Sequence, residues 1–168
     1  MINPTATDIL RLVDATLKDK VEPSLSDLTG RSALATVRHL LRHVLVRVEV
    51  EGQLLTEDIA ALRPLLAQVS RYLASKGVAL ANDIDAALAK AHRAPGAYPT
   101  LDSLGLEAGA LRECVYQALK QLQSLRDAHG TEPDYIAARA AIRSYLVRQI
   151  EEEEKTIGPA FYGQGPRR

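Results

Sequence analysis

Apolar residues recur every three or four positions along most of this chain, and this spacing constrains the fold more than any other feature. Ile9, Val13, Leu17 and Val21 are one example. Such spacing places apolar side chains on one face of an α-helix. Aromatic residues make up only 4% of the chain and Ala and Leu dominate, whereas strands favour β-branched and aromatic residues. The sequence therefore predicts an all-α fold.

Start and stop signals define two predicted helices at the N-terminal end. The first begins at a Thr5-x-x-Asp8 capping pattern and ends before Pro23, because the residue before a proline avoids the helical conformation. The second begins between residues 28 and 32 and runs to Glu51. Gly52 is its expected stop, since glycine commonly follows the last helical turn.

A third predicted helix extends to Gly77. Thr56 is its expected N-cap, and Glu57 and Asp58 follow at the positive end of the helix dipole. Pro64 lies inside this helix, and we expect it to bend the helix because a proline leaves one backbone carbonyl without its donor.

The second half of the chain carries signals for three more helices. The fourth lies over 84–91, with Asn82 as its cap. The fifth ends near Gly130 and contains an apolar stripe over 111–125. The sixth begins within 131–134, where a cap, an early proline and two acids coincide, and Gly158-Pro159 is its expected stop.

Six helices with mostly short connections are typical of an up-and-down bundle with antiparallel neighbours. A chain of 168 residues buries roughly 70% of its unfolded surface, enough for one sizeable core. We therefore expect one helical bundle domain over 1–158 and a flexible C-terminal tail over 159–168. The Pro- and Gly-rich segment 95–100 is either a hinge between two hairpins or a loop across the bundle end. We favour the loop, because neither half of the chain is large enough to fold stably on its own.

Charge and cysteine content exclude several classes of protein. The 21 basic and 21 acidic residues balance, whereas a nucleic-acid binder usually carries a basic field. The single cysteine, Cys114, excludes an internal disulfide framework and a multi-cysteine zinc site, and its neighbours predict a buried thiol. The apolar runs are far shorter than the ~20 residues of a membrane span. No secretory or transit signal is visible at the N-terminus, so we expect a cytoplasmic location.

The strongest cluster of polar side chains is predicted on the second helix. Arg38, His39, Arg42 and His43 form a local positive patch that could receive a phosphate, a carboxylate or an acidic partner surface. His39 and His43 are four residues apart and could also share a metal ion, given a carboxylate from another helix. The simplest interpretation is that the arginines pair with acids on neighbouring helices.

No catalytic motif is present in the sequence. The Gly-x-Ser-x-Gly elbow, the phosphate-binding loop and the dinucleotide glycine pattern are all absent, so we expect neither catalytic residues nor a cofactor. The acidic run over 151–154 is expected to be solvated or to pair with the arginine-rich helix.

Several positions carry a resemblance to a known family. They are Pro4-Thr5, Leu10, Leu17, Val21, Glu22-Pro23, Leu25, the segment 46–51, and the segment from Tyr145-Leu146 to Pro159. In these features the chain resembles small bacterial α-helical proteins of unknown function, often encoded beside or fused to aminoglycoside-phosphotransferase-like kinases and acyl-CoA dehydrogenases. The resemblance implies an accessory helical domain that works near such an enzyme, with no catalytic residue to transfer.

These observations favour a non-catalytic helical bundle that binds another protein or a second copy of itself, because apolar helix faces can remain available for a partner. Two alternatives stay open. One is a bundle that binds a small anion, such as an acyl-thioester or a phosphorylated compound, through Arg38 and Arg42. The other is a metal site at His39 and His43.

Overall fold

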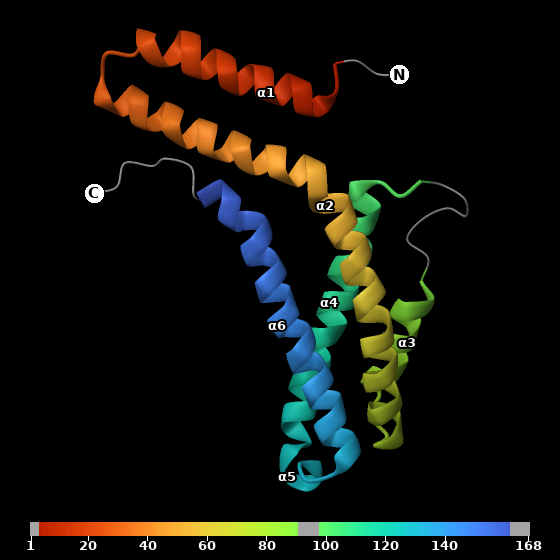
Figure 1. The fold of residues 1–168 in the computed structure, drawn as a ribbon. Helices are drawn as coiled ribbons and strands as arrows, with labels where there is room; N and C mark the ends of the chain where they lie inside the picture. The colour runs from red at the N-terminus through yellow and green to blue at the C-terminus, as the bar shows by residue number, and fades with distance from the viewer. Residues whose placement is uncertain (1–3, 91–97, 162–168) are drawn as a thin grey trace. The chain divides into compact units, whose positions relative to one another are not determined.

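The computed structural model is 88% helical. It describes residues 4–90 and 98–161, which contain six α-helices and no strand, and this confirms the all-α prediction (Figure 1). Contacts group the chain into two compact units, Met1–Glu51 with Glu151–Arg168, and Gly52–Ile150. The sequence predicted one domain over 1–158. Whether that region unfolds in a single step stays a prediction.

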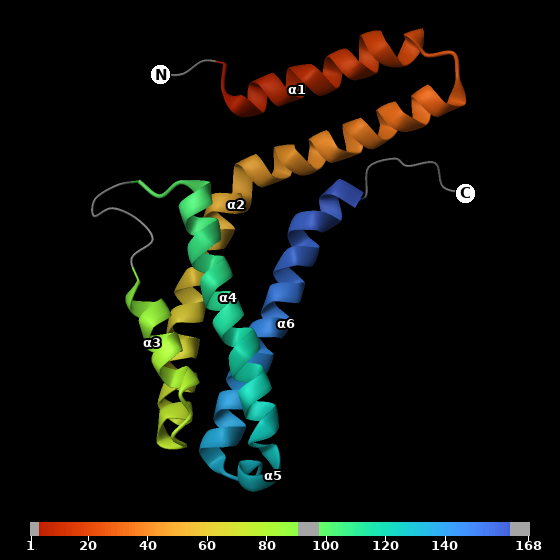
Figure 2. The same ribbon diagram turned by 180° about the vertical axis from the view of Figure 1, so that it is seen from behind.

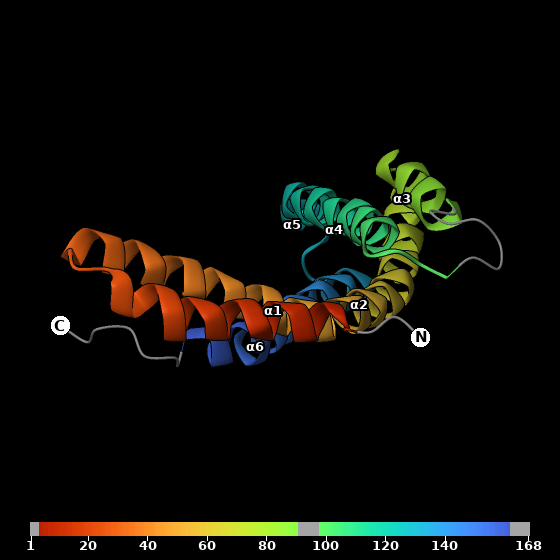
Figure 3. The same cartoon turned by 90° about the horizontal axis from the view of Figure 1, so that it is seen from above.

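In the first unit, α1 (Ala6–Thr16) runs antiparallel to the first part of α2 (Leu28–Ser75), as Figure 3 shows. The predicted cap at Thr5 is confirmed. The Asp8 amide donates to Thr5 Oγ1 at 3.2 Å, and the Thr5 amide donates to Asp8 Oδ2 at 3.1 Å. This reciprocal pair satisfies two backbone donors that a helix N-terminus leaves open.

Two helical turns follow α1, the first wider and the second tighter than a turn of α-helix. A π-helical turn, η1 (Leu17–Val21), follows α1, and a 3₁₀ turn, η2 (Glu22–Ser24), follows η1. Pro23 lies in the first turn of η2, where its missing N–H costs nothing. The α-helix ends at Thr16, and the predicted stop before Pro23 is wrong, because Glu22 keeps the helical conformation and the helical turns continue through Pro23 to Ser24. The next helix, α2, begins with the Gly30 amide bonded to Asp27 Oδ2 at 2.6 Å.

The predicted helix end at Gly52 is wrong, because α2 continues without a break to Ser75. Thr56 is no cap either, since its hydroxyl donates back to the Gly52 carbonyl at 2.8 Å. A helical glycine costs only about 1 kcal/mol relative to alanine, and the apolar spacing continues on both sides of it. A Cβ at Gly52 would lie 3.4 Å from Leu101 Cδ2, which is ordinary van der Waals contact. The helix also passes through Pro64, and the bend expected there stays a prediction.

The second unit contains the remainder of α2 together with α3 (Leu80–Ala89), α4 (Leu101–Ser124), α5 (Arg126–His129) and most of α6 (Pro133–Phe161). Figures 1 and 2 show these helices side by side, with the short α5 at the turn between α4 and α6. The predicted start of the sixth helix is confirmed at Pro133.

Gly77 ends α2 as predicted, with a positive φ of 68° that favours glycine. The Val78 amide donates to the Leu73 carbonyl and the Gly77 amide donates to the Ala74 carbonyl, each at 3.0 Å. These two bonds form a Schellman motif, which satisfies carbonyls at the helix end.

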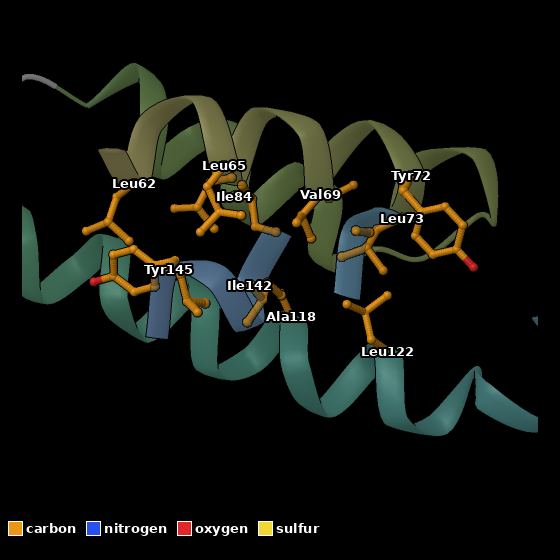
Figure 4. Close-up of a cluster of buried hydrophobic side chains, with 14 of the residues drawn as sticks. Leu62, Leu65, Val69, Tyr72, Leu73, Ile84, Ala118, Leu122, Ile142 and Tyr145 are labelled. Atoms are coloured by element: carbon orange, nitrogen blue, oxygen red, sulfur yellow. The ribbon is translucent and has the colours of Figure 1, made fainter. Parts of the chain in front are cut away.

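The core of the second unit is formed by side chains from α2, α3, α4 and α6 (Figure 4). Its fully buried members include Leu62, Leu66, Leu73, Ile84, Leu111, Leu122 and Ile142. Burying one leucine or isoleucine side chain contributes roughly 1.5–3 kcal/mol. The apolar residues of α2, spaced three or four positions apart, thus form one side of the packed core.

Two further boundary predictions are wrong. Asn82 is not the cap of the fourth helix, because α3 begins at Leu80 after Ala79. The sixth helix does not stop at Gly158-Pro159, since α6 continues to Phe161. The proposed break at 95–97 and the tail from 162 onward lie outside the described residues, while residues 98–100 lead into the Thr100 cap of α4.

Candidate functional site

Arg38, the first predicted anion-binding residue, is held in two ion pairs. Its Nε lies 2.8 Å from Asp14 Oδ1 and its Nη1 lies 3.0 Å from Glu22 Oε2. The hydrogen bond from Arg38 lowers the pKa of Asp14, and the same bond raises the pKa of Arg38. Only 14% of the arginine side chain is exposed. Arg38 therefore ties α1 and η2 to α2 and has little capacity left for a ligand.

His39 and His43 contact each other one helical turn apart. Their Nε2 atoms are 3.0 Å apart and their rings meet edge to face at 4.6 Å. At this separation the N–H of one imidazole donates to the ring nitrogen of the other, and the tautomers decide which ring is the donor. His39, Arg42 and His43 each make a further interaction. The histidine spacing predicted from sequence is thus present, but no group of three or more metal-ligating side chains occurs among the described residues.

Most large apolar side chains of α1 and the first part of α2 are exposed or half-buried rather than buried. Leu34 is its one buried hydrophobic residue within the described part of the chain. By contrast, eight large apolar residues in α1 and the first part of α2 are 42–84% exposed: Ile9, Leu12, Val13, Leu28, Val37, Leu40, Val44 and Val48. The sequence spacing placed Ile9 and Val13 on the apolar face of the first predicted helix. In the structure, half-buried and buried neighbours such as Leu10 and Leu34 take the inner positions.

Helical geometry places six of these side chains on one face of the hairpin. In α1, Leu10 and Asp14 occupy the side towards α2, and Ile9 and Val13 lie roughly a quarter to a third of a turn away. In α2, Leu34 and Arg38 occupy the inner side, and four of the exposed residues lie roughly the same rotation away, in the same sense. In antiparallel helices, equal rotations from the contact line lead to the same face.

We call this surface the hairpin apolar face and define it as Ile9, Val13, Val37, Leu40, Val44 and Val48. The exposed ion pair of Arg11 with Glu49, at 2.9 Å, lies on the opposite flank. Leu12 points away from α2 and does not belong to the face. Charged residues border the face, since Lys20, Arg47 and Glu51 follow Val13, Leu40 and Val44 by seven positions.

Sequence reasoning missed a buried polar cluster in the second unit. Asp58 of α2 is 5% exposed and accepts four contacts. Its Oδ1 receives the Tyr145 hydroxyl at 2.9 Å and the Gln149 amide at 2.6 Å, and its Oδ2 receives two guanidinium nitrogens of Arg112 at 2.9 and 2.8 Å. The prediction that Asp58 lies in the first turn of a helix is wrong, because α2 is continuous there.

The electrostatics of this cluster favour a structural role. Burial and then the Asp58 charge raise the pKa of Tyr145 to about 12, so the phenol stays protonated and donates. Burial lowers the pKa of Arg112 most of any single cause, but the charge of Asp58 and the hydrogen bonds to Tyr145 and Asp58 together outweigh it, so the net shift is upward. A carboxylate with four donors has no lone pair left for substrate. A signal was available, since Asp58 continues the stripe that includes Leu55 and Leu62.

The remaining polar side chains of the second unit make similar internal contacts. Arg63 pairs with Glu107 of α4 and donates to the Leu88 carbonyl at 2.9 Å. Cys114 is half-buried, and burial raises the pKa of its thiol, which disfavours the reactive thiolate.

Comparisons with protein-family models, with curated proteins and with solved structures found no match for this chain. Within the described residues, none of the helices has both the length and the apolar character needed to cross a bilayer.

Proposed function

We propose that this protein is a non-catalytic interaction module, and that its N-terminal hairpin binds another protein molecule. The hairpin apolar face carries this proposal. Isolated exposed apolar residues are ordinary on protein surfaces, but a contiguous group on one face marks an interaction site. Burying such side chains against a partner contributes about 25 cal/mol for each Å² of apolar surface.

The charged side chains support the same proposal, because their contacts are made with other residues of the protein. Asp58 and Arg38 each make more than one charged or polar contact, and all of these contacts are with residues of the same unit. The second unit supplies a folded core, and the hairpin supplies apolar surface for a partner. The family resemblance suggests an aminoglycoside-phosphotransferase-like kinase or an acyl-CoA dehydrogenase as one class of partner.

The size of the native particle in cell extract tests the proposal. A tagged full-length chain is expected to elute above its own mass of 18.3 kDa, and Leu40→Glu is expected to return it to the size of one chain. Leu12→Glu, on the outward side of α1, is the matched control and should leave the larger particle intact. A wild-type chain that elutes as one chain, both in extract and when purified, would overturn the proposal.

A metal site is the second candidate, favoured by the 3.0 Å separation of the His39 and His43 Nε2 atoms. A bound ion would replace the hydrogen-bonded proton and would need at least one more ligand. Elemental analysis of untagged protein after metal supplementation tests it. One equivalent of a transition metal, lost in His43→Gln, would support the site, and less than about one-tenth of an equivalent would exclude it.

A further inference from the structure

We infer that the partner of the hairpin apolar face is a second copy of this chain, which gives a symmetric dimer. This inference rests on the proposed function and names the occupant of the same surface. A two-fold dimer presents the same patch from both copies, so the patch must be complementary to itself.

Charge is the first argument for self-pairing. The six residues of the face are uncharged, and the charged residues that border it, Lys20, Arg47 and Glu51, are of both signs. The first unit, 1–51 with 151–168, carries 10 basic and 11 acidic side chains, so its net charge is close to zero and little net field opposes the approach of two copies. A partner that binds through charge, such as nucleic acid or an anionic membrane, would find no complementary excess here.

Area is the second argument. The 11 residues of α1 span about 16 Å, and the part of α2 up to Glu51 spans about 36 Å. Two helices, each about 10 Å wide, present a face of roughly 500–700 Å². Two such faces bury more than about 1,000 Å² in total, which is the range of a specific interface, at the lower end of the standard size.

Side-chain spacing is the third argument. Val37, Val44 and Val48 follow one another at intervals of seven and four residues, with Leu40 beside them. Intervals of this kind form the ridges that pack into the grooves of a facing helix. The side chains are short and mostly β-branched, so they lose little rotamer freedom on burial. The face therefore has the shape and the stiffness that helix-on-helix packing requires.

Sedimentation equilibrium of the purified full chain between about 1 and 100 μM tests the inference, because the dimer fraction depends on concentration. The wild type is expected to dimerise. Leu40→Glu and Val44→Glu are each expected to raise the dissociation constant at least about 30-fold, since each places a charge in the centre of the contact. Leu12→Glu is the matched control and should dimerise like the wild type.

The outcomes separate this inference from the proposed function. A wild-type monomer at about 100 μM, together with a larger particle in extract, would overturn the dimer and leave a different protein as the partner. A dimer that Leu40→Glu and Val44→Glu leave intact would overturn the assignment to this face. A monomer that binds phosphatidylserine vesicles, with binding lost in Leu40→Glu, would overturn the dimer and assign the face to lipid. If circular dichroism shows that a glutamate variant loses helix, the Val37→Ala/Val44→Ala double variant tests the same contact without a buried charge.

Discussion

Tyr145 of α6 donates its phenolic hydrogen to Asp58 of α2 across 87 residues of sequence, with 2.9 Å between the two oxygens. The carboxylate also receives Arg112 of α4, so one buried charge joins three helices of the second unit. Hydrogen bonds to a buried charged group are stronger than neutral ones, and leaving such a group unpaired is costly. The cluster therefore fixes how α2, α4 and α6 align.

Removing the Tyr145 hydroxyl should destabilise the fold. Tyr145→Phe is expected to lower the free energy of unfolding by about 1.5–3 kcal/mol, because a bond to a charged acceptor is lost while the ring still packs. Urea denaturation at pH 7 measures this. Tyr72→Phe is the matched control, since the Tyr72 hydroxyl is buried without a hydrogen-bond partner and its removal should cost little. Equal losses in the two variants would contradict the role assigned to Asp58.

The same tyrosine makes stability depend on pH in alkali. Its pKa is about 12 in the folded protein against 10.0 when unperturbed, so the folded state holds this proton more tightly. The stability linked to Tyr145 is complete below pH 10 and is lost as the pH rises through 12. The loss is on the order of 2 kcal/mol. Thermal melting between pH 9 and 12 should show a steeper decline for the wild type than for Tyr145→Phe, and parallel curves would contradict the shift.

Sequence periodicity predicted the helical class because apolar spacing is local information. Local signals also located the ends that depend on one residue: Thr5 with Asp8 at the start of α1, Gly77 at the end of α2, and Pro133 at the start of α6. The prediction that a helix ends at Gly52 was wrong, because a glycine ends a helix only where the packing does not continue past it. Residues that pack near Gly52, such as Leu101, lie far away in the sequence and are invisible to local reasoning.

The candidate sites were less predictable because they depend on which helices meet. Arg38 and His39 were identified by spacing, yet the partners of Arg38 come from α1 and η2. Asp58 was assigned to a helix end, and its burial became visible only with α4 and α6 in place. The sequence predicted apolar helix faces, some of them available for a partner, but periodicity does not show which side chains stay exposed after the helices pack.

Arg38→Gln should loosen the hairpin and restore the titration of Asp14. The folded pKa of Asp14 is lowered, so the stability it contributes is present above its unperturbed pKa of 3.8 and is lost as the pH falls through the folded value. Without the guanidinium, NMR titration should place the Asp14 pKa closer to 3.8, and stability at pH 7 should fall by roughly 1 kcal/mol. Arg47→Gln, at an exposed position, is the control. An unchanged Asp14 pKa in Arg38→Gln would contradict the effect assigned to the Arg38–Asp14 ion pair.

Substitution by alanine should change the stability of the protein in opposite directions at Gly77 and Gly105. Gly77 has a φ of 68°, which an alanine side chain strains, so Gly77→Ala is expected to cost about 1–2 kcal/mol. Gly105 lies inside α4, and no neighbouring atom lies within 4 Å of the position that a new Cβ would take. Gly105→Ala should therefore stabilise the protein by about 0.5–1 kcal/mol, because alanine loses less backbone entropy in a helix. Urea denaturation of the two variants beside the wild type measures both changes. A destabilised Gly105→Ala would show that this side of α4 contacts another part of the molecule or a partner.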